Sequence, residues 1–207
     1  MKTVLYLLRH GESVANAERR FAGSMDFPLT ETGIRQAQAA AERLRDVPFD
    51  AIYASDLLRA HQTAEPHAVL HGLPIRDEVG LRELFCGIWE GEKISDLEVR
   101  YPHEFLYEWR HRIGTFTPPG GESFPHLAAR MRDTLTRIAE ENPGKTVLIA
   151  SHAAAISAFY FRYVYGYSDE EVSEKLFYPA NTAHSVVEYE NGVFTPISYS
   201  VGGTATF

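Results

Sequence analysis

The sequence is poor in the features that define several classes of protein. Cys86 is its only cysteine, so the fold cannot depend on an internal disulfide bond. Lys and Arg together number 20 against 28 Asp and Glu, the formal net charge is −8, and no basic tract stands out. This balance argues against nucleic acid or an anionic membrane as a partner. It leaves room for a small anionic substrate, which needs only a local cluster of arginines.

Long hydrophobic runs are also missing. The apolar run near the start, residues 4–8, is too short for the core of a signal peptide or for a membrane span. We therefore expect a soluble, cytoplasmic protein. No internal repeat, low-complexity tract or long linker divides the chain. Its 207 residues, 44% of them hydrophobic, predict one domain with one sizeable core.

Strand-like and helix-like segments alternate along the chain, which predicts an α/β fold with a mostly parallel sheet covered on both faces. Thr30 is the predicted N-cap of the first helix, Ser55 or Asp56 that of the second, and Pro66 is expected to kink or interrupt the second helix. Polar loops are predicted at residues 12–29 and 118–121. The predicted strands are 4–8, 51–54, 73–75, 146–150 and a terminal hairpin of 185–189 with 194–198, and the predicted helices are 34–44, 56–70, 98–110, 124–141 and 153–163.

The first predicted strand leads directly into residues that can do chemistry. Arg9, His10 and Gly11 follow the apolar run, and ligands of open α/β sheets bind at the carboxyl ends of strands. The guanidinium of Arg9 suits phosphate or carboxylate, and His10 can act as base, metal ligand or nucleophile. Gly11 would let backbone approach a ligand closely. Taken alone, the motif is equally compatible with a strand that happens to end in these residues.

Three more segments follow the same logic. Arg59 lies in the first turn of the helix after the second strand, where the helix N-terminus already favours anions. Glu83 follows a short extended segment, and His152 follows the strand at 146–150. In a parallel sheet these side chains gather at one edge. Two histidines, two arginines and a glutamate suit phosphoryl transfer, because imidazole can attack, guanidinium groups can stabilise the equatorial oxygens, and a carboxylic acid can protonate the leaving group.

Motifs spread over most of the chain occur in a recognisable order: Arg9-His10-Gly11-Glu12, Asn16, Arg20-Phe21-Ala22-Gly23, Asp26, residues 29–37, residues 55–64, Leu81-Arg82-Glu83, Gly121-Glu122-Ser123 and Ser151-His152. As a set they resemble the motifs of the histidine phosphatase superfamily, in the branch that includes the cofactor-dependent phosphoglycerate mutases. The resemblance is least specific over residues 86–120 and toward the C-terminus. It implies a three-layer α/β/α sandwich, a single domain over residues 1–207, and a variable, substrate-facing segment at 86–120.

The resemblance also implies catalytic roles. His10 would be the nucleophile that becomes phosphohistidine. Arg9, Arg59 and His152 would hold the transferring phosphoryl group, and Glu83 would be the proton donor and later the base.

Asn16 and Gly23 match positions that line the phosphate pocket in relatives, and the resemblance implies neither a metal ion nor another cofactor. Arg82 and the other histidines, at positions 61, 67, 71, 103, 111, 126 and 184, are interpreted as structural or surface residues. Cys86 is expected to be a small buried residue rather than a reactive thiol.

Within this family the sequence favours a phosphatase. The span between Glu83 and His152 is short, and Ala153 stands where mutases usually have glycine. Residues 83–91 and 120–123 are similar to phosphatase members, including α-ribazole phosphatases and broad-specificity bacterial phosphatases. Arg110 and Arg112 either meet an anionic substrate or form a solvated helix face, and the second interpretation is slightly favoured.

We therefore predict a metal-independent phosphomonoester phosphatase that acts on a small phosphorylated substrate, with no nucleic acid or membrane as a partner. A cofactor-dependent phosphoglycerate mutase is the first alternative. A non-catalytic module that binds a phosphorylated ligand is the second. The sequence leaves the physiological substrate open, and it leaves open the oligomeric state, for which a homodimer is one option.

Overall fold

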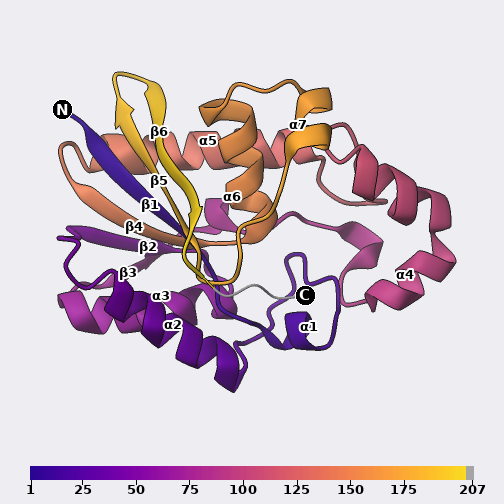
Figure 1. Cartoon of the computed structure of the whole chain (residues 1–207), viewed down its shortest axis with the longest axis horizontal. Coiled ribbons are helices and arrows are strands. Elements are labelled where there is room, and N and C mark those ends of the chain that lie inside the picture. The colour runs from indigo at the N-terminus through magenta and orange to yellow at the C-terminus, as the bar shows by residue number, and fades with distance from the viewer. Residues whose placement is uncertain (204–207) are drawn as a thin grey trace.

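A six-stranded sheet forms the centre of the molecule in the computed structural model, which describes residues 1–203 (Figure 1). The strand order is β3-β2-β4-β1-β5-β6. The neighbouring strands β3, β2, β4 and β1 run parallel to one another. Strand β5 runs antiparallel to β1, and β6 runs antiparallel to β5. The elements in chain order are β1 (Thr3–Arg9), α1 (Val14–Ala17), α2 (Glu31–Arg43), β2 (Ala51–Ala54), α3 (Leu58–His71), β3 (Ile75–Asp77), η1 (Val79–Leu81), η2 (Gly87–Trp89), α4 (Ile94–Arg100), η3 (Glu104–Trp109), α5 (Phe124–Glu141), β4 (Thr146–Ser151), α6 (Ala153–Phe159), η4 (Tyr160–Val164), α7 (Asp169–Lys175), β5 (His184–Glu190) and β6 (Val193–Val201).

Helices cover both faces of the sheet, as the alternating pattern predicts. Successive side chains of a strand point to opposite faces, so Leu7 joins the core beneath α5 and α6, whereas Leu8 joins the core beneath α2 and α3. Figure 1 shows these two helix pairs on opposite sides of the strands. The sandwich brings the carboxyl ends of β1, β2 and β4 to one edge. None of the helices in the described part of the chain combines the length and apolarity that a membrane span requires.

The start of α3 differs from the prediction. Neither Ser55 nor Asp56 caps it: the helix begins at Leu58, and Asp26, from a distant loop, accepts the Leu58 N–H at 2.7 Å. The carboxylate of Asp56 instead accepts hydrogen bonds from Nε and Nη2 of Arg82. Helix α3 also runs through Pro66 without interruption. A long-range partner, which local sequence cannot show, decides where the helix begins.

The predicted helix at 98–110 is two helices. Helix α4 ends at Arg100, just before Tyr101-Pro102, because the ring of a proline disfavours helical backbone in the residue before it. A π-helical turn, η3, follows. The predicted loop at 12–29 contains the short helix α1, which Ser13 and Asn16 begin with a capping box. Helix α7 was not predicted, and α6 passes into a second π-helical turn, η4.

Candidate active site

The carboxyl edge of the sheet opens into a cavity of about 540 Å³. Arg9, His10, Arg59 and Glu83 line it, and the ring of His152 lies with its centroid 5.2 Å from that of His10. The five side chains predicted to be catalytic are therefore brought together from four separate parts of the chain. The rest of the cavity wall comes mainly from residues 15–23 and 178–180 and from the segment 86–120.

His10 is buried at the end of β1, and its Nδ1 lies 2.6 Å from the carbonyl oxygen of Gly11. A carbonyl oxygen only accepts hydrogen bonds, so Nδ1 carries the proton and Nε2 keeps its lone pair. Burial, and then the positive charges of Arg59 and Arg9, holds the pKa of His10 well below its ordinary value. The imidazole is thus neutral at neutral pH, which is the nucleophilic form.

The glycine after His10 has a structural reason other than the predicted approach of a ligand. A Cβ on Gly11 would lie 2.6 Å from the Gly33 carbonyl oxygen, and a Cβ on Gly33 would lie 2.1 Å from the Glu12 carbonyl oxygen. Helix α2 therefore packs backbone to backbone against the loop that carries His10. The Gly11 N–H also donates to the Thr63 hydroxyl of α3 at 3.0 Å, which joins the loop to a second helix.

Arg9 and Arg59 both line the cavity, and backbone carbonyls hold both. Arg9 donates through Nη1 to the Pro179 carbonyl at 2.6 Å. Arg59, fully buried in the first turn of α3, donates through Nη1 to the Met25 carbonyl and through Nη2 to that of Gly23, each at 2.7 Å. Carbonyl partners orient a guanidinium group without neutralising it, so both side chains keep their positive charge for a ligand.

Each of these arginines keeps at least one unfilled donor, its Nε–H. Within residues 1–203, the buried Nε atoms of Arg9 and Arg59 have no hydrogen-bond partner. Burial lowers the pKa of Arg9 to about 10, against the opposing effect of Glu83, and burial likewise lowers the pKa of Arg59. Both remain protonated at neutral pH. Buried cations with spare N–H groups favour a bound oxyanion.

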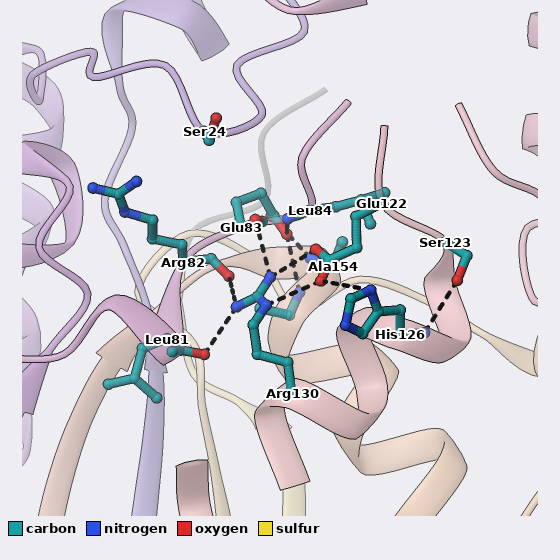
Figure 2. A network of polar contacts seen from close by, with 12 residues as sticks. Ser24, Leu81, Arg82, Glu83, Leu84, Glu122, Ser123, His126, Arg130 and Ala154 are labelled. Carbon is teal, nitrogen blue, oxygen red and sulfur yellow. Dashed lines mark hydrogen bonds and ion pairs between the residues drawn. The ribbon is translucent and has the colours of Figure 1, made fainter. Parts of the chain in front are cut away.

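Glu83 faces the cavity from an irregular segment between η1 and η2. Backbone N–H groups fix its carboxylate (Figure 2): Oε1 accepts from Leu84 at 2.8 Å and from Ala155 at 3.0 Å, and Oε2 accepts from Ala154 at 3.0 Å. Three donors on two oxygens orient the plane of the carboxyl group. An acid–base residue needs such a position beside the reacting atoms.

His152 occupies the N-cap position of α6 and is fully buried, and neither ring nitrogen has a partner in the described part of the chain. Burial, and then the nearby Arg59 and His10, holds its pKa well below the ordinary value. A neutral imidazole offers one N–H donor. The ring packs against that of His10, so the two imidazoles share the base of the site.

Asn16 and Gly23, predicted to line the phosphate pocket, both line the cavity. The Oδ1 of Asn16 accepts the Ser13 N–H at 3.1 Å, so its Nδ2 is the group that can donate to a ligand. Gly23 has φ of 49°, and a Cβ there would lie 2.1 Å from Oε1 of Glu90. Because its carbonyl also holds Arg59, Gly23 positions the cation as well as shaping the wall.

The segment 86–120 contributes only Cys86, Ile94 and Trp109 to the cavity. The thiol of Cys86 donates to the Leu84 carbonyl at 3.3 Å, and burial raises its pKa well above the ordinary value. It therefore stays a neutral thiol, in keeping with the predicted buried residue.

The two arginines whose role the sequence leaves open, Arg110 and Arg112, lie outside the cavity. Arg110 pairs with Glu98, and Arg112, just beyond the end of the helix, pairs with Glu108 at 3.4 Å, and both arginines are exposed. This agrees with a solvated face. Arg82, whose partner is Asp56, is structural as predicted, although the segment is not a strand.

Several residues of the site were not predicted. Arg19 lines the cavity mouth with φ of 53°, and Tyr178, Pro179 and Ala180 line it from the connection between α7 and β5. No local pattern identifies that connection. Thr63, which joins Gly11 to Arg59, lies within a family-like motif and could have been found there.

The seven remaining histidines do not line the cavity. His67, on α3, is fully buried and packs against Phe49. His184, on β5, is almost fully buried. Among residues 1–203, no group of three or more His, Cys, Asp or Glu side chains is placed to hold a metal ion.

Comparison with known sequences identifies the family. The model of the histidine phosphatase superfamily, branch 1, matches residues 5–201. A curated relative named probable phosphoglycerate mutase GpmB, from Photorhabdus laumondii subsp. laumondii, is 40% identical over 156 residues, which are 73% of this chain and 70% of the relative. A Yersinia pestis relative of the same name is equally similar over the same shares.

Solved structures similar to this chain include both phosphatases and a mutase. A mycobacterial glucosyl-3-phosphoglycerate phosphatase has a TM-score of 0.88 and 27% identity, over 98% of this chain and 100% of that one. The α-ribazole phosphatase from Shigella flexneri has a TM-score of 0.82 and 28% identity, over 98% of each chain. A phosphoglycerate mutase from Bacillus anthracis has a TM-score of 0.80 and 26% identity, over 96% of this chain and 93% of that one. On its sequence match and its fold, this chain belongs to the histidine phosphatase superfamily, in branch 1.

Proposed function

We propose that this protein is a metal-independent phosphomonoester phosphatase that acts through a phosphohistidine. One observation carries the proposal: a neutral His10 with a defined tautomer shares a cavity with two incompletely paired arginines and with Glu83. A nucleophile, cations for the phosphoryl oxygens and an acid–base group are the three requirements of this chemistry.

In the first half-reaction, Nε2 of His10 attacks phosphorus and the P–O bond to the leaving alcohol breaks. Arg9, Arg59 and His152 donate to the equatorial oxygens, whose negative charge grows in the transition state. Glu83, in its acid form, gives its proton to the leaving oxygen. The proton on Nδ1 stays bonded to the Gly11 carbonyl.

In the second half-reaction, the Glu83 carboxylate takes a proton from water as the water oxygen attacks phosphorus. The P–N bond breaks, inorganic phosphate leaves, and Nε2 of His10 recovers its lone pair. Glu83 then carries the proton needed for the next cycle, so the residue alternates between acid and base.

The lining of the cavity supports a phosphatase over a mutase. A mutase must hold the carboxylate of a phosphorylated acid in two orientations, which calls for extra cations. The segment 86–120 brings no cation to the cavity, because Arg110 and Arg112 pair with surface glutamates. Its contribution, Ile94 and Trp109, suits an ester with an apolar leaving group.

Phosphoglycerate mutase activity remains the second candidate. Curated relatives that are 40% identical to this chain carry that name. Arg19 and Arg20 line the cavity mouth, where they can meet a substrate carboxylate. Arg20 is already engaged with Glu18 and with the Gly91 carbonyl. Arg19 is therefore the residue on which this alternative depends.

The test is a panel of phosphomonoesters assayed with a chelator present: aryl phosphates, sugar phosphates, nucleotides, α-ribazole phosphate and the phosphoglycerates. We expect phosphate release, an acid-labile phosphoenzyme in wild type, and neither in His10→Ala. Transfer between phosphoglycerate positions, stimulated by a bisphosphate and faster than hydrolysis, would establish the mutase instead. Binding across the panel without turnover would point to the non-catalytic module.

A further inference from the structure

We infer that Arg130 and Glu122 form a positioning pair that holds the Glu83 backbone at the distance proton transfer requires. Neither residue lines the cavity, so they act through neighbouring residues and not on the substrate. Arg130 holds the segment of Glu83 and also helps to lower the pKa of His152, an effect of charge that Arg130→Lys preserves. The inference rests on the proposed function, since it concerns the acid–base residue of that reaction. It also gives a role to Gly121-Glu122-Ser123, a motif that the proposed mechanism does not use.

The irregular segment that carries Glu83 needs outside partners for its backbone. Residues 82–86 belong to neither a helix nor a strand, so the carbonyls around Glu83 lack the partners that regular structure supplies. Arg130 of α5 provides them (Figure 2). Its Nη1 donates to the carbonyls of Gly80 at 2.9 Å and Arg82 at 3.0 Å, and its Nη2 donates to that of Glu83 at 3.4 Å.

Glu122 accounts for the remaining donors of Arg130. The Arg130 Nε donates to Oε1 of Glu122 at 3.0 Å, and Nη2 donates to Oε2 at 2.8 Å, in a two-pronged pair. Arginine has five N–H groups, and five hydrogen bonds are formed. Lysine has three donors at a single point and cannot reproduce this fork. The site thus requires an arginine specifically.

The three residues of the motif each serve this arrangement. A Cβ on Gly121 would lie 2.5 Å from the Phe85 carbonyl oxygen, so only glycine permits the approach. The Glu122 N–H donates to that same carbonyl at 2.7 Å. The Ser123 hydroxyl accepts the His126 N–H and begins α5, the helix that carries Arg130.

Glu83 is therefore held at two points: its carboxylate by the start of α6, and its backbone by Arg130 of α5. Without the second point, the carboxyl group can shift relative to the leaving oxygen while His10 and the cations stay in place. A displacement near 1 Å costs catalysis about 100-fold. The loss should fall on protonation of the leaving group, because that is the step Glu83 performs.

The experiment measures kcat/KM of Arg130→Lys and Glu122→Gln on a poor leaving group, an alkyl phosphate, and on an activated one, 4-nitrophenyl phosphate. We expect about a 10- to 100-fold loss on the alkyl ester and less than about 3-fold on the aryl ester, a weaker form of the Glu83→Gln pattern. The matched control is Arg132→Lys, on the same helix, whose partners are Asp133 and Tyr163. It should leave both rates unchanged.

A second readout separates positioning from loss of folded protein. In Arg130→Gly, added guanidinium ion should restore turnover of the alkyl ester, and the wild type should show no such gain. Equal losses on both esters in folded Glu122→Gln, or no loss in either variant, would overturn the inference. Its failure is distinct from failure of the proposed function, because in the latter case the wild type itself releases no phosphate from any ester.

Discussion

His10 and His152 show how burial selects the protonation state of a residue. Both rings are buried beside Arg59, so desolvation and then positive charge disfavour the imidazolium form. For His10, neutrality leaves the lone pair of Nε2 that the proposed reaction needs. For His152, it leaves one N–H without a partner among residues 1–203. In the proposed reaction, the arginine that binds the phosphoryl group would therefore also keep the attacking nitrogen unprotonated.

The protonation of His10 gives the first residue-scale prediction. Its pKa is lowered, so the neutral form persists as pH falls and is lost only well below the ordinary value near 6.5. Imidazole ¹⁵N shifts should show His10 neutral, with its proton on Nδ1, from about pH 7 to pH 6, where an ordinary histidine takes up a second proton. Arg59→Gln, which removes one positive charge, should raise the pKa of His10. A wild-type titration of His10 near 6.5 would contradict the proposed electrostatics.

The proposed acid role of Glu83 gives the second residue-scale prediction. In Glu83→Gln the side chain can no longer donate or accept the catalytic proton, while its amide fills similar space. We expect kcat/KM to fall about 100- to 10,000-fold on alkyl phosphates, which need a protonated leaving group, and far less on 4-nitrophenyl phosphate. Steady-state kinetics on both esters measure the difference, and equal losses would argue against an acid role.

At the scale of elements, the site depends on how helices meet the loops after the strands. Helix α2 contacts the loop after β1 through Gly33, and α3 contacts the same loop through Thr63. Helix α3 is itself capped by Asp26 from the loop that holds Arg59. These contacts are short backbone approaches and single hydrogen bonds, so each depends on one residue.

Gly33→Ala tests the contact between α2 and the His10 loop. Within a helix, alanine is ordinarily more stable than glycine by about 0.5–1 kcal/mol. Here the added Cβ would meet the Glu12 carbonyl at 2.1 Å, and the clash is with backbone. We expect the opposite sign, a loss of about 1–3 kcal/mol, together with lower kcat/KM. Urea unfolding measures the change in stability. A Gly33→Ala variant more stable than wild type would refute the contact.

His67, on the buried face of α3, makes the stability of the protein sensitive to acid. Burial lowers its pKa to about 4, and neither ring nitrogen has a partner within residues 1–203. The unfolded chain takes up a proton as pH falls through about 6.5, whereas the folded chain resists until about pH 4, so stability is lost across that window. His67 alone should account for about 2 kcal/mol between pH 7 and pH 5.

His67→Leu removes this titration. Its free energy of unfolding should fall less steeply with acid than that of wild type, whatever the two values are at pH 7. Urea titrations at both pH values measure the slopes. Parallel slopes would mean that His67 is not the group responsible.

At the scale of the whole molecule, an acidic chain carries a cationic site. The formal net charge of the chain is −8. The cavity nevertheless has more arginines than carboxyl groups in its lining, with Arg9 and Arg59 beside His10. Local charge, and not the sum over the chain, decides which ligand binds. Of the described cavity residues, Glu83 is the one with a carboxyl group, and backbone N–H groups hold it.

Anion binding should therefore stabilise the folded protein. Vanadate or phosphate would fill the spare donors on Arg9 and Arg59, and at 100 times its Kd a ligand adds about 2.7 kcal/mol. For a chain of this size that raises Tm by about 5–10 °C. Thermal melts with and without the anion measure the shift. Arg59→Gln should lose it and the exposed Arg35→Gln should keep it, and an equal shift in both would mean that the anion binds elsewhere.

The sequence alone determined much of this protein, because periodicity and motif order are local properties. The strands at β1, β2 and β4, the helices α2 and α5, and the convergence of Arg9, His10, Arg59, Glu83 and His152 at one sheet edge all followed from it. Apolar runs and caps act within a few residues, and parallel strands place their carboxyl ends together.

Only the tertiary structure decided the partners of those residues. Asp26 caps α3 in place of Ser55 or Asp56, the Gly11 carbonyl sets the tautomer of His10, and Arg130 supports the segment of Glu83. The contacts of Asp26 and Arg130 join residues far apart in the chain. The contact between His10 and Gly11 joins neighbours, and it depends on the backbone conformation after β1. Sequence pattern identifies which groups can react, whereas packing decides how far apart and in which protonation state they meet.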